Sequence, residues 1–164
     1  MRPAGCPRPV RIETFANRFR GRENFRLVVA GDGPLRPALL ALTEELGISE
    51  QVDVRGFINR EEVMELLDKS HVFVLASRAE TFGVVVVEAM ARGLPVISSD
   101  IDGTREIVTE ENGLLFPPGD KTALGDAMEW MVDHHEEYSR TQIVESVRSR
   151  FGPDAVFNAL FGHD

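Results

Sequence analysis

The segment Val72-Phe-Val-Leu-Ala-Ser-Arg-Ala-Glu80-Thr-Phe-Gly83-Val-Val-Val-Val-Glu88-Ala-Met-Ala-Arg-Gly93-Leu-Pro-Val-Ile-Ser-Ser-Asp100 decides the fold of this chain. It opens with a continuous apolar run of the kind found in buried parallel strands, and residues 94–99 form a second such run. Between them, the β-branched residues 84–87 favour a strand. A helix that starts near Gly83 and stops at Gly93 fits the same residues equally well. The residues alone leave both alternatives open.

The rest of the chain repeats this alternation of strand and helix. We expect strands over residues 25–30, 52–57 and 113–116, and helices over residues 35–46, 60–69, 121–135, 138–151 and 153–160. Strands that alternate with helices predict an α/β, Rossmann-like fold, with a parallel sheet, helices on both faces and extra helices at the C-terminus. Ligands of such sheets bind outside the carboxyl ends of the strands.

Composition limits the classes of partner. The chain has 18 basic and 27 acidic residues, a formal net charge of -9, which disfavours nucleic acid. Its single cysteine, Cys6, allows no intrachain disulfide and no cysteine-rich zinc site. No run reaches the ~18 apolar residues that cross a bilayer, and the N-terminus has no signal-peptide pattern. We therefore expect a cytoplasmic protein with no transmembrane segment.

Several motifs follow one another in a fixed order. Glu80 and Glu88 have seven residues between them, and small residues, a glycine and a proline follow. Further along stand Glu106-Ile-Val, Asn112-Gly-Leu-Leu-Phe and Pro118-Gly-Asp. Together these motifs resemble the C-terminal, donor-binding domain of family-4 (group 1) glycosyltransferases, which is the C-terminal half of a GT-B fold. The resemblance favours the helix at Gly83 over the strand.

The resemblance also implies how the chain is divided. Residues 25–164 would form the nucleotide-sugar-binding domain, and residues 1–24 a remnant of a first helix or an irregular segment. Within that remnant, Ile12, Phe15 and Phe19 have helical spacing.

By resemblance, the residues around Gly83 hold the donor. Glu80 would be the catalytic residue and accept hydrogen bonds from hydroxyls of the donor sugar. The backbones of Phe82, Gly83 and Val84 would contact the diphosphate and the sugar, because a helix N-terminus favours an anion. Glu88 would accept hydrogen bonds from the ribose, a task that suits a carboxylate with two acceptor oxygens.

Four further residues are weaker donor-binding candidates. Gly31 lies in a turn that is chiefly structural by its sequence. Phe57 and Ile58 would lie beside the nucleotide base, or alternatively in the core. Gly103 would border the diphosphate from a loop, but Asp102 stands where the family has a first glycine, which restricts the approach of the backbone.

Two features read as structural. His134 and His135 are adjacent, so on a helix they point about 100° apart, and they imply no metal site. Trp130, together with Leu124, Met128 and Met131, has the spacing of a core-facing helix.

The activity that the resemblance implies is retaining transfer of a hexosyl group from a nucleotide-diphosphate sugar, with no cofactor and no metal. The family's arginine and lysine at the diphosphate have no counterpart here, since the first lysine is Lys69; Arg8 or Arg11 could substitute. The acceptor domain would come from a separate polypeptide partner. The alternatives are a non-catalytic nucleotide-sugar-binding or interaction module and, less well matched, a nucleotide-sugar epimerase.

Overall fold

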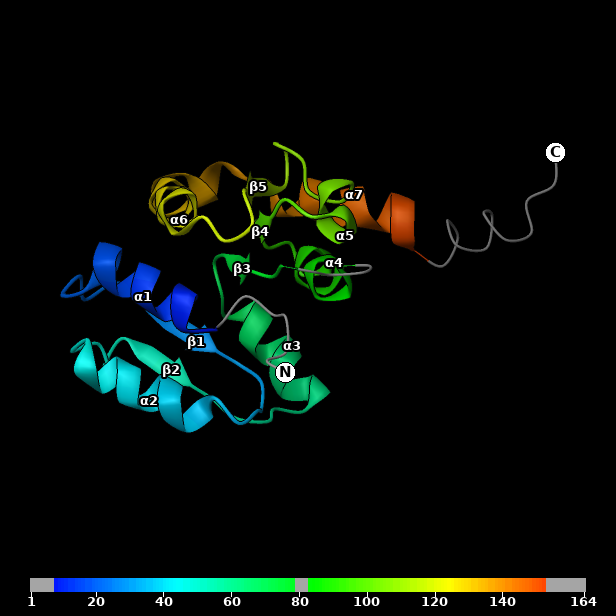
Figure 1. Cartoon of the computed structure of the whole chain (residues 1–164). Coiled ribbons are helices and arrows are strands. Elements are labelled where there is room, and N and C mark those ends of the chain that lie inside the picture. Colours follow the sequence, from blue (N-terminus) through cyan, green and yellow to red (C-terminus); the bar gives the residue numbers. More distant parts are fainter. Residues whose placement is uncertain (1–7, 79–82, 153–164) are drawn as a thin grey trace, which may run out of the picture.

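A computed structural model describes residues 8–78 and 83–152 of the chain (Figure 1). The elements are α1 (Arg8–Phe19), β1 (Leu27–Val29), α2 (Arg36–Glu45), β2 (Val52–Val54), α3 (Arg60–Asp68), β3 (Phe73–Leu75), α4 (Val84–Ala91), β4 (Val96–Ser99), α5 (Asp102–Arg105), β5 (Gly113–Phe116), α6 (Lys121–His134), the 3-10 turn η1 (His135–Glu137) and α7 (Arg140–Phe151). The expected helix over residues 153–160 lies outside the described residues.

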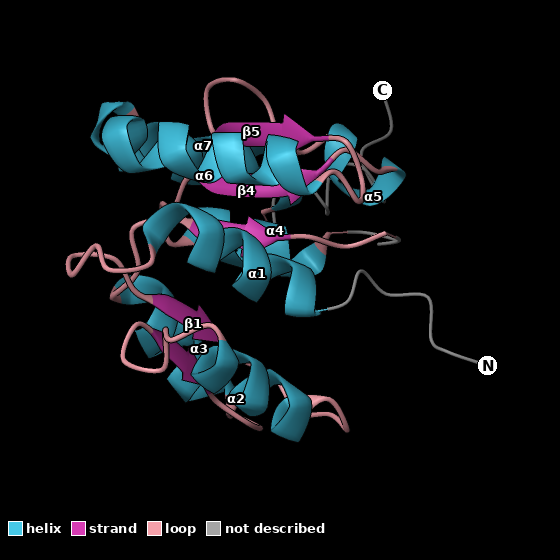
Figure 2. Cartoon of the chain, turned by 60° about the vertical axis from the view of Figure 1, so that its left-hand side comes forward, coloured by secondary structure: helices cyan, strands magenta, loops and turns pink. Residues whose placement is uncertain are grey.

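The strands are all parallel, and helices lie on both sides of them, as the sequence predicts (Figure 2). They form two hydrogen-bonded sheets rather than one. One sheet has two strands, in the order β1-β2, and the other has three, in the order β3-β4-β5. The alternation of strands and helices in the sequence did not predict this division.

Helix α1 belongs to the main hydrophobic core. Ile12, Phe15 and Phe19 are buried along one face of α1, which confirms the helical spacing. Their core cluster includes Val29 of β1 and Ile97 of β4, so one cluster packs against both sheets. Helix α1 also packs against α2 and α6. The first helix is therefore an integral part of this fold.

The segment after Gly83 is a helix, as the resemblance implies and local propensity does not. Val86, Ala89 and Met90 of α4 are fully buried, and they share a second core cluster with Ile143 of α7. Burial of this face against α7 outweighs the modest preference of β-branched residues for a strand.

Two expectations are corrected by the structure. Residues 102–105, expected as a loop, form the short helix α5, in which Thr104 Oγ1 donates to the Ser99 carbonyl oxygen at 2.5 Å. Trp130, expected in the core, is 41% exposed. Its ring instead stacks on His134 at 4.1 Å, whereas Leu124 and Met131 of α6 are fully buried.

We predict that Ile12→Ala lowers the free energy of unfolding by about 2–5 kcal/mol, because it leaves a cavity under both sheets. Asn17→Ala, on the exposed face of the same helix, is the matched control and should change stability by less than about 0.5 kcal/mol. Urea denaturation followed by circular dichroism measures both values. Equal losses in the two variants would show that α1 is not part of the core.

Candidate functional site

The candidate site lies at the carboxyl ends of the parallel strands, where the loops after β1, β2, β3 and β4 emerge (Figure 2). Its centre is the N-terminus of α4, which follows β3. Of the predicted donor contacts, Glu80 and Phe82 lie outside the described residues. Gly83, Val84 and Glu88 lie at this helix start or one turn after it.

Gly83 starts α4 in the left-handed region, with φ 57° and ψ 30°. A Cβ at this position would lie 2.5 Å from the carbonyl oxygen of Gly103 and 3.1 Å from Ile107 Cδ1. The site therefore requires glycine for two reasons, its backbone conformation and the close approach of α5. The structure brings together Gly83 and Gly103, two of the predicted donor contacts. The expectation that Gly103 lies in a loop is wrong, because it is buried in the helix α5.

The first turn of α4 offers free hydrogen-bond donors. The N–H groups of Val86 and Val87 donate to the Gly83 carbonyl oxygen, at 2.8 and 3.1 Å. Among the described residues, no side chain caps this helix, and the N–H groups of Val84 and Val85 have no acceptor. A helix start with unused N–H groups and a positive dipole end is suited to binding an anion.

Glu88 lies one turn into α4 and is half-buried. Within the described part of the chain, its carboxylate has no hydrogen-bond or ion-pair partner. A half-buried carboxylate without a protein partner is free to accept hydrogen bonds from a ligand.

The end of β4 holds the loop that precedes α4. The backbone N–H of Ser77 donates to the hydroxyl of Ser99 at 3.1 Å, and Ser99 also receives the hydroxyl of Thr104 at its carbonyl oxygen. Ser99 and Thr104 are both buried. The sequence interpretation missed these two residues. The one feature of the sequence that could have indicated them is that both carry hydroxyl groups close to the carboxyl end of a predicted strand.

The loops after β1 and β2 meet at the other half of the site. The N–H of Gly31 donates to the Gly56 carbonyl oxygen at 3.1 Å, and this bond joins the two loops. Phe57 is 80% exposed, so the alternative that it lies in the core is wrong, while Ile58 is half-buried. Arg36, which the sequence interpretation missed, places Nε 3.5 Å from the Cβ position of Gly56.

Charges beside α5 are already paired. Arg105 donates to Asp100 at 2.7 Å and to Asp102 at 3.2 Å. The hydrogen bond to Asp100 and the charges of both carboxylates raise the pKa of Arg105 above its usual value. This ion pair offsets the negative charge of two carboxylates close to the helix start where an anion would bind.

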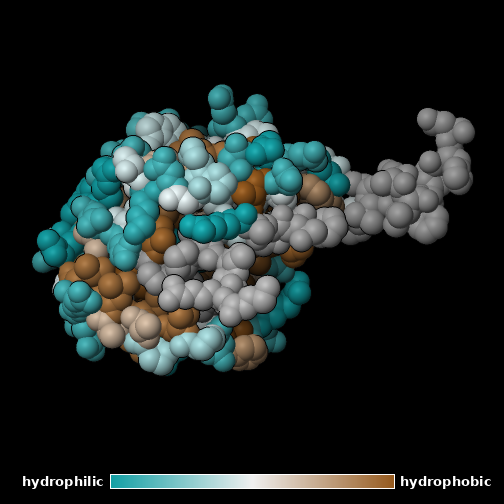
Figure 3. Space-filling model, in the orientation of Figure 1, coloured by the Kyte–Doolittle hydropathy of each residue, from teal (hydrophilic) through white to brown (hydrophobic). Residues whose placement is uncertain are grey.

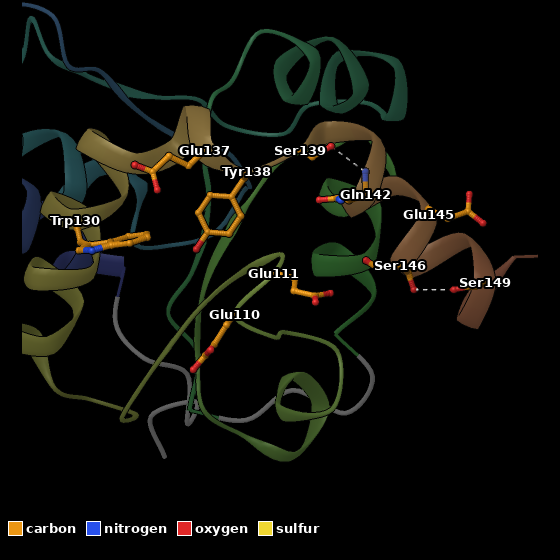
Figure 4. Close-up of a pocket in the computed structure, with 10 residues that line it drawn as sticks. All are labelled: Glu110, Glu111, Trp130, Glu137, Tyr138, Ser139, Gln142, Glu145, Ser146 and Ser149. Carbon is orange, nitrogen blue, oxygen red and sulfur yellow. Dashed lines mark hydrogen bonds between the residues drawn. The ribbon is translucent and has the colours of Figure 1, made fainter.

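A separate pocket of about 540 Å³ lies between α6, η1, α7 and the turn that precedes β5 (Figure 4). Glu110, Glu111, Glu137 and Glu145 line it. Burial, together with Glu137 and Glu110, raises the pKa of Tyr138, which points into this pocket. The pocket is acidic and lies at the amino end of β5, so it repels a diphosphate and is not the donor site.

The predicted lack of a metal site stays a prediction. Over residues 8–78 and 83–152, no three His, Cys, Asp or Glu side chains lie close enough to hold a metal ion. Across the same ranges, no helix is both long enough and apolar enough to span a bilayer.

Comparison with known proteins identifies the family. The family model described as "Glycosyl transferases group 1" matches residues 11–149. The chain belongs to the group 1 glycosyltransferases. It is 31% identical to alpha-D-kanosaminyltransferase of Streptomyces kanamyceticus over 76% of this chain and 33% of that enzyme. This chain spans about a third of the length of the curated relatives that it matches.

Solved structures of other glycosyltransferases share the fold. Sucrose-phosphate synthase from Thermosynechococcus elongatus is 27% identical, with a TM-score of 0.77 over 94% of this chain and 42% of that one. HepE from Anabaena, solved in complex with UDP-glucose, is 21% identical, with a TM-score of 0.80 over 99% of this chain and 47% of that one. The predicted family and GT-B architecture are confirmed.

We predict that Gly83→Ala destabilises this glycosyltransferase domain more than Gly21→Ala does. Both glycines have a positive φ, which costs a side chain about 1–2 kcal/mol, but a Cβ at Gly21 meets nothing within 4 Å. The clash with Gly103 should add about 1–3 kcal/mol at Gly83. Thermal and urea unfolding of the two variants measure the difference. Equal losses would mean that α5 does not press against the start of α4.

Proposed function

We propose that this domain binds a nucleotide-diphosphate sugar at the carboxyl edge of its two sheets and presents it for retaining transfer of a hexosyl group. The observation that carries the proposal is the N-terminus of α4, where Gly83 allows close approach and where, among the described residues, the N–H groups of Val84 and Val85 have no acceptor. Backbone N–H groups and the helix dipole would bind the diphosphate there.

Each end of the donor then has a group of matching chemistry. Glu88, which is half-buried and has no partner among the residues that the structure describes, would accept hydrogen bonds from the ribose hydroxyls. The exposed ring of Phe57, with Ile58 and Gly31 beside it, would contact the base. Glu80 would accept hydrogen bonds from the sugar as the catalytic residue, with Phe82 contributing its backbone, as the family resemblance implies.

Two arginines are candidates for neutralising the diphosphate in place of the missing arginine and lysine. Arg78 is exposed in the loop after β3, and its guanidinium reaches to 4.0 Å from the Cβ position of Gly119. Arg36 lies at the start of α2 beside Gly56. Among the described residues, neither arginine has an ion-pair partner, so both are free to pair with a phosphate.

The nucleotide chemistry is supported by family membership and by the complex of HepE with UDP-glucose. No cofactor or metal is part of the proposal. The acceptor, and an acceptor-binding part outside residues 1–164, are proposed from the relatives, of which this chain spans about a third. We propose a cytoplasmic location from the sequence alone.

A non-catalytic nucleotide-sugar-binding module is the second candidate, and one observation favours it. Lys69, the first lysine of the chain, lies at the C-cap of α3 in an ion pair with Glu65, shortly before the amino end of β3 and so away from the carboxyl edge. Departure of a nucleoside diphosphate requires positive charge at the phosphates. Binding without turnover would result if Arg36 and Arg78 do not supply that charge.

Isothermal titration with UDP-glucose, UDP-N-acetylglucosamine, GDP-mannose and ADP-glucose tests the binding proposal. We expect saturable binding of at least one donor, and Glu88→Gln should weaken it about tenfold, because one charge-assisted hydrogen bond is replaced by a neutral one. Glu50→Gln, before β2 and so at the opposite edge of the sheet, is the matched control and should leave affinity unchanged. Absence of binding for all four donors would contradict the proposal.

Activity is measured separately from binding. With the best-bound donor, residues 1–164 alone should release nucleoside diphosphate only slowly, because no acceptor is held beside the sugar. Arg78→Ala should weaken donor binding, whereas Lys69→Ala should not. Rapid transfer to an added acceptor by residues 1–164 would contradict the requirement for an acceptor-binding part outside these residues.

A further inference from the structure

The pocket between α6, η1, α7 and the turn before β5 lies outside the proposed donor site (Figure 4). Its volume of about 540 Å³ is within the range of pockets that hold small organic molecules. Trp130 and Tyr138, the only tryptophan and the only tyrosine of the chain, both line it. The molecule therefore has a cavity of ligand size at the amino end of β5, opposite to the donor loops.

The charge of this pocket is negative, and the protein does not neutralise it. Two of its carboxylates, Glu110 and Glu111, come from the turn before β5. The other two are Glu137 of η1 and Glu145 of α7. Among the residues that the structure describes, no lysine or arginine lines the pocket, and none of the four carboxylates has an ion-pair or hydrogen-bond partner. Like charges around one cavity repel one another, so a bound cation would lower the energy of this arrangement.

Tyr138 lies within this negative field. Burial, followed by the charges of Glu137 and Glu110, raises the pKa of its phenol. These two carboxylates belong to different elements, so the negative potential extends across the pocket. Arg140 and Arg150 of the adjoining helix α7 do not offset it, because both donate to backbone carbonyl oxygens of residues that do not line the pocket.

The spacing of the carboxylates favours an extended cation over a metal ion. Within residues 8–78 and 83–152, no three His, Cys, Asp or Glu side chains lie close enough to hold a metal ion. The negative charges are instead spread around a cavity that several non-hydrogen atoms can enter. A linear amine with two or more ammonium groups has separate positive charges along its length, so it can reach carboxylates that a single ion cannot bring together.

The hydrogen-bonding groups of the pocket match an ammonium group. Ionised carboxylates only accept hydrogen bonds. The hydroxyl of Ser146 already donates to the Ile143 carbonyl oxygen at 2.7 Å, and that of Ser149 donates to the Ser146 carbonyl oxygen at 3.3 Å. Both hydroxyl oxygens can still accept. The ligand must therefore supply N–H donors, and each primary ammonium group has three.

A small molecule fits this pocket better than a docked protein does. The cores of protein interfaces are depleted of charged residues, whereas four carboxylates surround this cavity. Figure 3 shows apolar surface gathered over the half of the molecule that contains α1 and α2, while the half that contains α6 and β5 is largely hydrophilic. The pocket therefore lies away from the surface that an apolar partner would cover.

We propose that this pocket binds a linear polyamine, a small molecule with two or more ammonium groups on a methylene chain. Its ammonium groups donate to Glu110, Glu137 and Glu145, and its methylene groups lie against the rings of Trp130 and Tyr138. The site is separate from the proposed donor site and does not depend on it.

Spermidine is the probe, and Trp130 is the reporter, because the only tryptophan of the chain lines the pocket. Residues 1–164 are titrated at low ionic strength, where screening of charges is weak, and tryptophan fluorescence is followed. NMR of the labelled chain locates the site and also detects binding that leaves the fluorescence unchanged. We expect saturable shifts at the Trp130 indole N–H and at the amides of Glu111 and Glu137, and none at Gly31 and Gly83.

Two double variants with the same net charge separate a specific site from general attraction to an acidic protein. Glu110→Gln together with Glu137→Gln should weaken spermidine binding about three- to tenfold, because two partly exposed ion pairs are lost. Glu44→Gln together with Glu61→Gln, on the exposed surfaces of α2 and α3, is the matched control and should change affinity less than about twofold. Circular dichroism checks that both variants are folded.

Two further ligands test the need for N–H donors. Hexamethylenediamine and hexamethonium have the same charge and the same methylene chain, but the quaternary groups of hexamethonium cannot donate. The diamine should bind about tenfold more tightly, because charge-assisted hydrogen bonds are lost with hexamethonium. Magnesium chloride at equal ionic strength should not shift the Trp130 indole signal.

Any of four results would overturn the proposal. One is the lack of a saturable shift at Trp130 with spermidine, and another is equal weakening in the two double variants. The third is binding of hexamethonium as tight as that of hexamethylenediamine, which would show attraction by charge alone. The fourth is binding of a lysine-rich peptide without binding of spermidine, which would assign the pocket to a protein partner.

Discussion

The close contact between Gly83 and the carbonyl oxygen of Gly103 is the constraint on which the candidate site depends. It sets the start of α4 against α5, and only a residue without a Cβ can take this position with a positive φ. Because α4 begins there, its first free N–H groups lie at the carboxyl edge of the sheet. Thr104 of α5 in turn bonds to Ser99, the last residue of β4. One glycine contact thus fixes the strand end, the short helix and the anion-binding helix start relative to one another.

Much of the fold could be predicted from the sequence, because strand and helix patterns alternate clearly along it. The start of α4 could not be predicted from local propensity, since the valines at 84–87 favour a strand. The helix is stabilised by tertiary packing, because Val86, Ala89 and Met90 are buried with Ile143 of α7. Trp130 has the spacing of a core residue, yet its ring stacks on His134 at the surface. Helical spacing alone does not distinguish a side chain at the border of the apolar face from one at its centre. Helix α5 was missed because a four-residue helix has no periodicity to detect.

The site itself could be predicted only in part. The glutamate and glycine positions follow from the family motifs, whereas Arg36, Ser99 and Thr104 belong to segments that meet only in the fold. The division into two sheets depends on which strands are hydrogen-bonded neighbours. The pattern of apolar residues predicts where strands occur but not which strands lie side by side. The electrostatics show the same limit. A net charge of -9 does not show where the carboxylates lie: they gather at the pocket around Tyr138, while Arg105 offsets those beside α5.

The proposed donor would bridge the two sheets. Phe57 and Gly31 follow strands of one sheet, whereas Gly83 and Glu88 follow a strand of the other, so a bound nucleotide sugar would contact both sheets at once. In this structure α1 and the core around it connect the sheets, and no backbone hydrogen bond joins β1 to β3 within the described residues. Any relative motion of the sheets lowers affinity, because binding must then restrict it.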